Sequence, residues 1–503
     1  MKVVFLPLDE RPCNYLYPQE LPLSEDIQLV LPPKEILGKQ KKSGDVHAIS
    51  SWLKKECEDA DYALLSLDTL LYSGIVPSRL HHNTYEELAS RSDVLRQIKE
   101  DHPRLKIYAH ELVMRTPSYD LATEEPDYFA ICGLAIYKEG VFRDKEALGV
   151  LNEEEKMQRD ENLKLIKPEY LDDFVSRRTI NKKVLMHNLE LARDGVIDFF
   201  LIPQDDCSPY GYTASDRRDI LSVIETLGIQ DKVIMHPGAD EAGLTLISRC
   251  LEDIHQKPLK FYVEYNCDKT KDAVPEFESQ PIDLSITSQI ISTNSVRIDD
   301  PKDADIVLLI NAGSAFMWNR IPEFESHFAE RNIEKLCNSA SKYLQQEKCV
   351  AVGDVALCNR GDLALLQGLY SHNLLGRITS YAGWNTSSNT LGTTIANAIA
   401  FAYSHNDLQR RRSLICRYLE DFFYMAEVRV DINDKIGIDH LWGEDIHCLN
   451  EMKKPVEEYV RDNIKRLSTK YQLRLIADFS DINVDFVWNR TFEIEVKVTW
   501  NKF

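Results

Sequence analysis

The chain has 503 residues, 44% of them hydrophobic, and a formal net charge of −21 at pH 7. This length and apolar content are enough for two or three globular domains with a large core. The acidic balance argues against nucleic acid as the main partner, because phosphate binding needs a basic surface.

The N-terminus does not have the pattern of a targeting segment. Asp9, Glu10 and Arg11 interrupt the first apolar run too early for the hydrophobic part of a signal peptide. No uninterrupted apolar run approaches the ~20 residues of a membrane span. The 11 cysteines contain no C-x-x-C pair, which favours reduced thiols over disulfides or structural zinc. We therefore expect a cytoplasmic protein that has no membrane partner.

Short apolar runs typical of buried strands alternate with amphipathic stretches up to about residue 400. Such alternation predicts a mainly parallel sheet with helical crossovers. The strand count favours a (β/α)8-like barrel with extra elements, and an open, doubly wound sheet is the alternative. The predicted strands are 2–8, 27–31, 61–67, 105–111, 196–202, 232–236, 259–265, 304–311, 348–353 and 377–381. The predicted helices between them include 46–59, 85–100, 214–228, 323–345 and 386–403.

Two segments depart from this alternation. Residues 137–195 are charged and helical, and we expect a pair of helices inserted there. The polar stretch 266–282 predicts either a lid or an exposed connection.

The pattern changes again after residue 404 and predicts a small α+β subdomain. We therefore expect a catalytic barrel-like domain over 1–404 and the α+β subdomain over 405–503. The elements expected in the subdomain are helices over 405–425 and 453–468 and strands over 474–478 and 492–498.

Acidic residues directly follow four of the predicted strands. The most informative case is Pro203-Gln204-Asp205-Asp206, which follows a buried apolar run. Any single acid of this kind is typical of a helix cap, but parallel strands end at one face of the sheet, where α/β proteins place their active sites. We expect one cleft there, lined by Asp9, Asp68, Asp205, Asp206, Asp240 and Asn385. The other acids are Asp9, Asp68, Asp240 and Glu241.

Two adjacent carboxyl groups can acquire different pKa values from their surroundings, so that one stays an acid while the other is ionised. Glycoside hydrolysis needs two such carboxyl roles. We therefore expect Asp205 and Asp206 to be catalytic. The alternative is that the pair caps the helix that follows, from Thr213 to Leu227. Cys207, inside the same motif, is interpreted as a small packing residue.

Three arginines, Arg11, Arg79 and Arg115, also come just after predicted strands. Each is expected either to bind the substrate or to pair with an acid in a buried ionic network. Asn311 and Asp354 end strands as well and are candidates for the same cleft.

The stretch from Tyr381 to Gly392 places small and polar residues around Trp384 and Asn385. A tryptophan at such a position can stack on a sugar face, and an asparagine can bind hydroxyl or acetamido groups. In the alternative interpretation, Trp384 packs in the core and either Asn385 or Thr386 caps the next helix.

Cofactor motifs are missing from the sequence. There is no Walker loop, and no G-x-G-x-x-G follows the first strand, so we expect no nucleotide cofactor. His236 is the only histidine at a strand end among these motifs, which disfavours a nitrogen-rich zinc site. An oxygen-only magnesium or manganese site stays open. We nevertheless expect no metal in the reaction.

These motifs together resemble a bacterial family catalogued as domain of unknown function 4127. The resemblance is carried by Pro7 to Pro12, Leu67-Asp68, Val76 to Arg79, Pro203 to Asp206, Pro237 to Glu241 and Ala382 to Thr386, and it spans nearly the whole chain. A weaker similarity links the acid pair, with an asparagine and an aromatic near the last strand, to retaining β-N-acetylhexosaminidases of the O-GlcNAcase and bacterial hyaluronidase type. That similarity implies that Asp205 orients the substrate acetamido group and that Asp206 is the general acid and base.

We therefore expect a glycoside hydrolase that acts on a small glycoside or oligosaccharide, with N-acetylhexosamine as a candidate constituent. If a protein carboxylate attacks instead of the acetamido group, Asp240 or Glu241 is the expected partner. The alternatives are a divalent-metal hydrolase of an amide or phosphate and a non-enzymatic sugar-binding protein. The oligomeric state stays open, with a homo-oligomer among the candidates.

Overall fold

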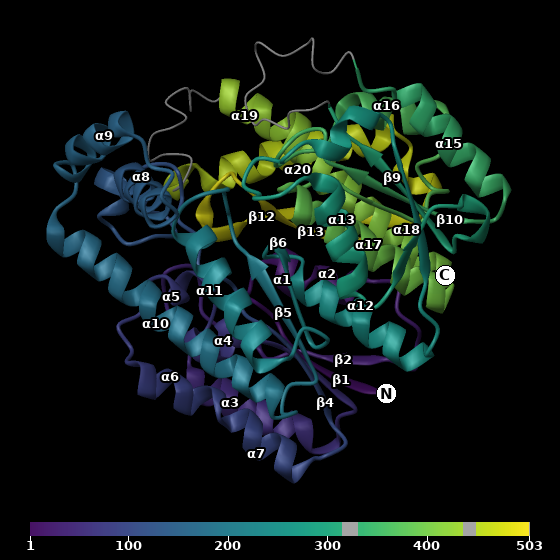
Figure 1. The fold of residues 1–503 in the computed structure, drawn as a ribbon. Coiled ribbons are helices and arrows are strands. Elements are labelled where there is room, and N and C mark those ends of the chain that lie inside the picture. The colour runs from purple at the N-terminus through teal and green to yellow at the C-terminus, as the bar shows by residue number, and fades with distance from the viewer. Residues whose placement is uncertain (314–329, 436–448, 502–503) are drawn as a thin grey trace. The chain divides into compact units, whose positions relative to one another are not determined.

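The computed structural model describes residues 1–313, 330–435 and 449–501. The chain divides into two compact units, which we describe separately (Figure 1). Unit 1 comprises Met1–Glu10, Asp26–Leu246 and Phe277–Gln280, and unit 2 comprises Arg11–Glu25, Ile247–Glu276 and Pro281–Phe503.

Unit 1 is built on a six-stranded sheet in which every strand pair is parallel. The strand order is β2-β1-β3-β4-β5-β6, so β2 and β6 are the two edges. Its inner strands are buried, as the apolar runs predict for a parallel sheet that is covered on both faces. The strands are β1 (Lys2–Leu6), β2 (Gln28–Val30), β3 (Tyr62–Ser66), β4 (Lys106–His110), β5 (Phe199–Gln204) and β6 (Val233–Pro237).

Unit 2 contains a second parallel sheet, of five strands. Its order, β8-β7-β9-β10-β11, repeats the order of the first five strands of unit 1. In such open sheets ligands bind beyond the carboxyl ends of the strands, where the order reverses. The strands are β7 (Lys260–Tyr265), β8 (Val296–Ile298), β9 (Ile306–Asn311), β10 (Cys349–Asp354) and β11 (Ser380–Ala382).

The sequence predicted the mixed α/β class and parallel pairing, and both are confirmed. The expected single (β/α)8 barrel is not confirmed, because the described strands pair into two separate sheets with free edges. The physical reason is that a strand followed by a crossover helix reads alike within one barrel and within two open sheets. The short strand β8 was missed.

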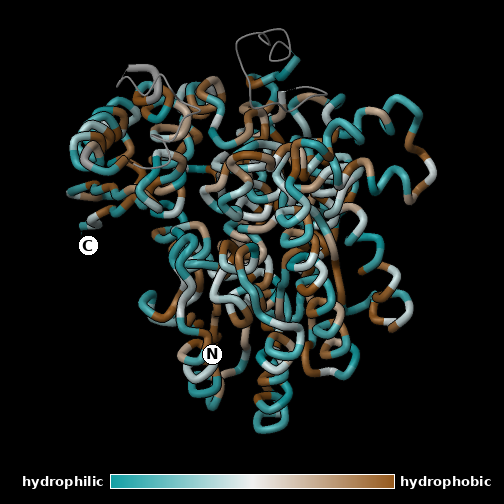
Figure 2. Tube along the Cα trace, turned by 90° about the vertical axis from the view of Figure 1, so that its left-hand side faces the viewer, coloured by the Kyte–Doolittle hydropathy of each residue, from teal (hydrophilic) through white to brown (hydrophobic). Residues whose placement is uncertain are grey.

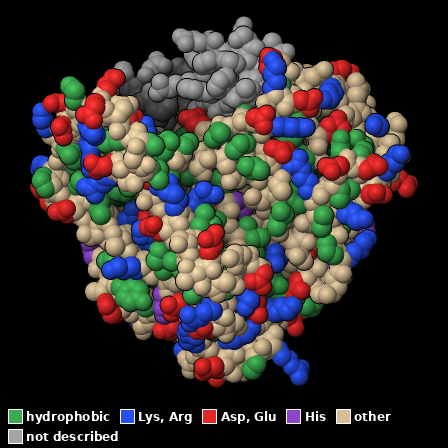
Figure 3. All heavy atoms as spheres, viewed as in Figure 1, with side chains coloured by type: hydrophobic (Ala, Val, Ile, Leu, Met, Phe, Trp, Pro, Cys, Tyr) green, Lys and Arg blue, Asp and Glu red, His purple; other side chains and the backbone are tan. Residues whose placement is uncertain are grey.

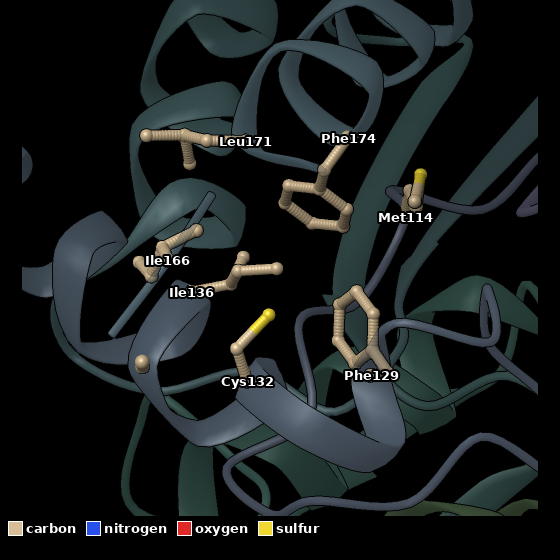
Figure 4. Close-up of a cluster of buried hydrophobic side chains, with 8 residues drawn as sticks. Met114, Phe129, Cys132, Ile136, Ile166, Leu171 and Phe174 are labelled. Atoms are coloured by element: carbon tan, nitrogen blue, oxygen red, sulfur yellow. The ribbon is translucent and has the colours of Figure 1, made fainter. Parts of the chain in front are cut away.

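Unit 1 also contains the inserted segment that was expected over residues 137–195. This segment holds three helices where a pair was expected. Two of them, α8 and α10, pack through an apolar cluster that contains Met114, Phe129, Ile136 and Phe174 (Figure 4). The helices of unit 1 are α3 (Val46–Glu56), α4 (Leu67–Tyr72), α5 (Ile75–Ser78), α6 (Tyr85–Ser92), α7 (Val94–Asp101), α8 (Phe129–Ala147), α9 (Glu153–Leu163), α10 (Pro168–Arg193), α11 (Tyr212–Leu227) and α12 (Ala242–His255), within which the division between the units falls.

Unit 2 has a largely helical remainder. Its longest apolar helix, α17, is buried along most of its length and packs on β10 and β11. A π-helix, η5 (Tyr418–Val428), continues directly from α18. The α-helices are α1 (Pro12–Tyr15), α2 (Tyr17–Glu20), α13 (Ile282–Ser292), α15 (Ile333–Gln345), α16 (Leu363–Ser371), α17 (Ser387–Ser404), α18 (Asp407–Arg417), α19 (Arg429–Lys435) and α20 (Lys453–Lys470).

The C-terminal part has the predicted α+β composition. An antiparallel hairpin joins β12 (Phe479–Phe486) to β13 (Ile494–Trp500). The strand predicted over 474–478 is wrong, because a 3-10 turn occupies Leu473–Leu475 and the strand starts only afterwards. The domain boundary expected at residue 404 stays a prediction. Residues 323–329 of the helix predicted over 323–345 lie outside the described residues.

Hydropathy follows these elements. Figure 2 shows hydrophobic stretches alternating with hydrophilic ones along the chain. Within the described ranges, no helix is both long enough and apolar enough to cross a membrane. Acidic and basic side chains are interspersed over the face seen in Figure 3.

Candidate functional site

The two predicted catalytic residues lie at the carboxyl end of β5. All six residues of this strand are buried, and it pairs with β4 and β6, so its end has a rigid support. Asp205 is 7% exposed, and Asp206 has a backbone φ of 29°, in the left-handed region. Non-glycine residues rarely adopt this conformation, and where they do it often marks a functional site.

Each aspartate is held by its own arginine. Arg79, which follows α5, donates from Nη2 to Asp205 Oδ2 at 2.6 Å. Arg115, which follows β4, donates from Nη1 to Asp206 Oδ2 at 2.9 Å. Two of the arginines expected to contact substrate or acids therefore contact the acid pair itself. The structure thus supports the ionic-network interpretation for both.

Two glutamates that the sequence did not single out connect the arginines. Glu125 Oε1 accepts from Arg79 Nη1 at 3.2 Å and from Arg115 Nε at 2.8 Å. Glu124 Oε2 also accepts from both arginines, at 3.1 and 3.2 Å. We call Arg79, Arg115, Glu124, Glu125, Asp205 and Asp206 the carboxylate–arginine network. It holds four carboxyl groups and two guanidinium groups, so full ionisation would leave an excess of negative charge.

The environment separates the two aspartates electrostatically. Burial raises the pKa of Asp206 to about 7; the Arg115 guanidinium opposes this shift, and the neighbouring Asp205 adds to it. Asp205 is tied to Arg79, an ion pair in which the arginine side chain is only 2% exposed. Burial therefore favours the protonated form of Asp206, whose neighbour Asp205 contacts its own cation, Arg79.

A small pocket lies beside the network, at the carboxyl ends of β3 and β4. Its volume is ≈ 10 Å³, the space of about one water-sized sphere. Asp68, one of the predicted substrate-binding residues, lines it, and burial raises the pKa of this carboxyl to about 7. The polar residues of the lining are Asp68, Tyr72, Ser78, Arg79, Glu111, Asn181 and Asp205.

The acids after β6 shape a turn. Glu241 is fully buried, and its Oε2 accepts from the main-chain N–H of Ala239 at 2.8 Å. Gly238 has a φ of 135°, and a Cβ there would collide with the Glu241 carboxyl, so the turn requires glycine. Asp240 is 7% exposed. Glu241 therefore supports the loop conformation, whatever else it does.

Asp9 is buried after β1. The Thr69 hydroxyl, on α4, donates to the main-chain oxygens of Pro7 and Leu8, both at 2.7 Å. These bonds fix the end of β1 beside the start of α4, the helix that contains Asp68. Asp9 thus lies on the strand end next to β3, where the strand order of the sheet reverses.

The remaining predicted residues belong to unit 2. Trp384 is 2% exposed, its indole Nε1 donates to Thr393 Oγ1 at 3.2 Å, and its ring meets Tyr17 edge to face at 5.4 Å. These contacts match the alternative interpretation, in which Trp384 packs in the core. Asn385 Oδ1 accepts from the main-chain N–H of Thr386 at 2.6 Å, at the start of α17.

Arg11 also belongs to unit 2, where its guanidinium carbon lies 5.0 Å from the centre of the Trp488 ring and Nη1 lies 4.0 Å from Glu493 Oε1. The expectation that Asp9, Asp68, Asp205, Asp206, Asp240 and Asn385 line a single cleft stays a prediction, because Asn385 and the acids are in different units.

Comparison with known protein families assigns the chain to one of them. A family model described as "Protein of unknown function (DUF4127)" matches residues 3–497. The chain belongs to this DUF4127 family. A search of curated proteins found no match. The resemblance deduced from the motifs is thereby confirmed for the family, and the similarity to N-acetylhexosaminidases stays a hypothesis.

In this DUF4127 protein, a second polar cluster lies at the strand ends of unit 2. Asn311 Nδ2, after β9, donates to Asp354 Oδ1 at 2.8 Å and to Asp362 Oδ2 at 3.2 Å. The Tyr381 hydroxyl donates to Asp354 Oδ2 at 3.0 Å. Asn311 and Asp354 therefore contact each other at the ends of β9 and β10, and the expectation that they share the cleft of the other acids stays a prediction.

The described part of the DUF4127 protein offers no ready set of ligands for a metal ion. No three His, Cys, Asp or Glu side chains there are arranged to hold an ion. The ten cysteines in those ranges are free thiols.

Glu124 and Glu125 escaped sequence reasoning because they precede Pro126 and a helix, where acids usually act as caps. Their adjacency, like that of Asp205 and Asp206, was the only signal that could have found them.

Proposed function

We propose that this DUF4127 protein is a glycoside hydrolase in which Asp206 is the general acid. The observation that carries the proposal is the contrast within the acid pair: burial raises the pKa of Asp206 to about 7, while Asp205 Oδ2 accepts from Arg79 at 2.6 Å. Two carboxyl groups with different protonation are the arrangement that glycosidic bond cleavage uses.

The expected chemistry follows from these positions. Asp206 gives its proton to the glycosidic oxygen as the bond to the anomeric carbon breaks, and it later takes a proton from the incoming water. Asp205 orients the group that attacks or stabilises the developing positive charge at the anomeric centre. The similarity to N-acetylhexosaminidases supports the orienting role. No cofactor is needed for this chemistry.

The size of the neighbouring pocket constrains how a substrate binds. A volume of ≈ 10 Å³ admits one small substituent and not a sugar ring. We therefore place the ring outside the pocket, above the end of β5, with a single substituent directed inward. Asp68 and Asp205, which both line the pocket, are then placed to receive hydrogen bonds from that substituent.

Turnover of a chromogenic panel tests this proposal. Purified full-length protein is assayed against 4-nitrophenyl glycosides of neutral, N-acetylated and amino sugars, with Asp206→Asn as the inactive reference. Hydrolysis of at least one glycoside that is lost in Asp206→Asn supports the proposal. Sugar binding without turnover would favour a binding protein. Activity on amides or phosphates that a chelator abolishes would favour a metal hydrolase.

A further inference from the structure

The pocket beside Asp205 has a lining rich in hydrogen-bond acceptors. Three carboxyl groups line it, those of Asp68, Glu111 and Asp205, and each of these residues is at most 7% exposed. Arg79 is the only cation in the lining, and its guanidinium is already shared among Asp205, Glu124 and Glu125. The lining therefore holds more carboxyl groups than cations.

Glu111 has an oxygen without a partner. Its Oε2 accepts from Asn188 Nδ2 at 2.7 Å, and no donor among the described residues reaches its Oε1. Glu111 as a whole residue is 2% exposed. Asp68, on the adjoining strand end, accepts from the main-chain N–H of Leu112 at 3.1 Å.

The raised pKa values of Glu111 and Asp68 also favour a cation between these two acids. Burial raises the pKa of Glu111 well above its usual range, and the neighbouring Asp68 adds to the shift. For Asp68, burial is again the main cause; Asp205 adds to the shift, while Arg79 and the main-chain donors oppose it. The uncharged Asn181, Ser78 and Tyr72 complete this side of the pocket. A cation between the acids would favour their ionised forms and displace their protons.

We propose that this pocket binds the primary ammonium group of the substrate, so that the substrate is a glycoside of an amino sugar with a free amine. The inference rests on the proposed function and narrows its substrate class. An ammonium group has three donors and about the size of one water molecule, which suits the acceptors and the ≈ 10 Å³ volume. An acetamido group is larger and uncharged. A metal ion needs a set of ligands that the described residues do not bring together.

Binding measurements on the full-length protein test the inference without requiring turnover. Glucosamine, N-acetylglucosamine and glucose are titrated by calorimetry at pH 7.5, in two buffers that differ in ionisation enthalpy. We expect glucosamine to bind at least tenfold more tightly than the other two sugars and to release protons on binding. Equal affinity for the three sugars, or no glucosamine binding, would overturn the inference.

Variants locate the site. Glu111→Gln keeps the size of the side chain and its contact with Asn188, and we expect it to weaken glucosamine binding at least tenfold. Glu86→Gln, at an exposed position of α6, is the matched control and should bind as the wild type does. If Glu111→Gln fails to fold, Asp68→Asn replaces it with the same expectation. Unchanged glucosamine affinity in a folded variant of either kind contradicts the assignment.

The two proposals can fail separately. Ammonium-selective binding with no turnover of any glycoside would leave this inference standing and remove the hydrolase. Turnover of N-acetylated or neutral glycosides, with no preference for a free amine, would keep the hydrolase and remove the ammonium site.

Discussion

Arg79 and Asp205 lie 126 positions apart in the chain, and Arg79 Nη2 donates to Asp205 Oδ2 at 2.6 Å within unit 1. Both side chains are at least nine-tenths buried. The same guanidinium contacts two glutamates, so one arginine compensates three carboxylates inside the protein. Arg115 also contacts both glutamates, so Arg79 is one of two cations on which this part of unit 1 depends.

Removal of Arg79 should be strongly destabilising. Arg79→Met removes the arginine that Asp205 contacts and leaves Glu124 and Glu125 with Arg115 alone, and loss of one partner of a buried ion pair typically costs about 3–5 kcal/mol. Urea unfolding followed by circular dichroism measures the change. Arg96→Met is the control, because its partner Asp194 and Arg96 itself are each about one-third exposed, and surface pairs contribute roughly 0–1 kcal/mol. Equal losses in the two variants would contradict the prediction.

Substitution of the proposed acid should depend on the leaving group. Asp206→Asn removes the proton donor, and general acid catalysis typically supplies ~10²–10⁴-fold, so kcat/KM for a poor leaving group should fall by about that factor. Glycosides with a leaving group that needs no protonation should lose much less. Asp205→Asn should slow both classes alike if Asp205 orients the attacking group.

Rate measurements on both variants, with thermal melting as the folding check, decide this prediction. Asp219→Asn, at a half-exposed site on α11, serves as the control. Near-normal rates of Asp206→Asn on the poor leaving group would exclude Asp206 as the acid. A large drop in melting temperature would instead indicate a capping role.

Asp68 should make the protein less stable as the pH rises toward neutrality. Its pKa is about 7 in the folded protein, above the ~3.9 of an unfolded aspartate. Between these values the folded form retains a proton that the unfolded form has lost. This group's contribution to the free energy of unfolding therefore falls, by roughly 1.4 kcal/mol per pH unit.

Asp68→Asn has no such titration, so between pH 4 and 7 its stability should rise relative to that of the wild type. Urea midpoints across that range measure the difference in slope. Asp219→Asn should run parallel to the wild type. The urea midpoints of Asp68→Asn and the wild type could instead differ by the same amount at every pH in this range. That result would show that Asp68 is ionised in the folded protein.

His110, in contrast to Asp68, should make the protein less stable as the pH falls below neutrality. The side chain is 1% exposed at the end of β4, neither ring nitrogen has a partner among the described residues, and burial lowers its pKa to about 3. Below the ~6.5 of an unfolded histidine, only the unfolded form gains the proton. Stability should therefore be lost as the pH falls from about 6.5 toward 3.

His110→Leu should lose less stability on acidification than the wild type, at little cost at pH 7, because no hydrogen bond is removed. The free energy of unfolding at pH 7 and pH 5 tests this. His102→Leu, in the turn before β4, is the matched control. An equal loss in the wild type and His110→Leu would falsify the buried neutral state.

The strands could be predicted because parallel strands buried on both faces read as apolar runs, as β5 and β9 do. The division of the strands between two sheets could not be predicted, because β6 and β7 are joined by a helix like the helices that join strands within each sheet. Asp205 was found from its place after β5. Glu125 was missed because its contacts to Arg79 and Arg115 depend on how a loop folds back, which no local pattern encodes. Trp384 was weighed both ways, since composition around a tryptophan does not reveal whether its ring is covered.

The interleaving of the two units has a consequence for dissecting the protein. The chain passes from one unit to the other after Glu10, Glu25, Leu246, Glu276 and Gln280. A single proteolytic nick therefore releases neither unit, and no one truncation point yields either as an intact fragment. A fragment that ends at Leu246 would lack Phe277, whose carbonyl oxygen accepts from the Cys207 N–H at 2.9 Å, next to Asp206. Gene designs that express one half alone would thus remove the main-chain acceptor beside the very loop they aim to study.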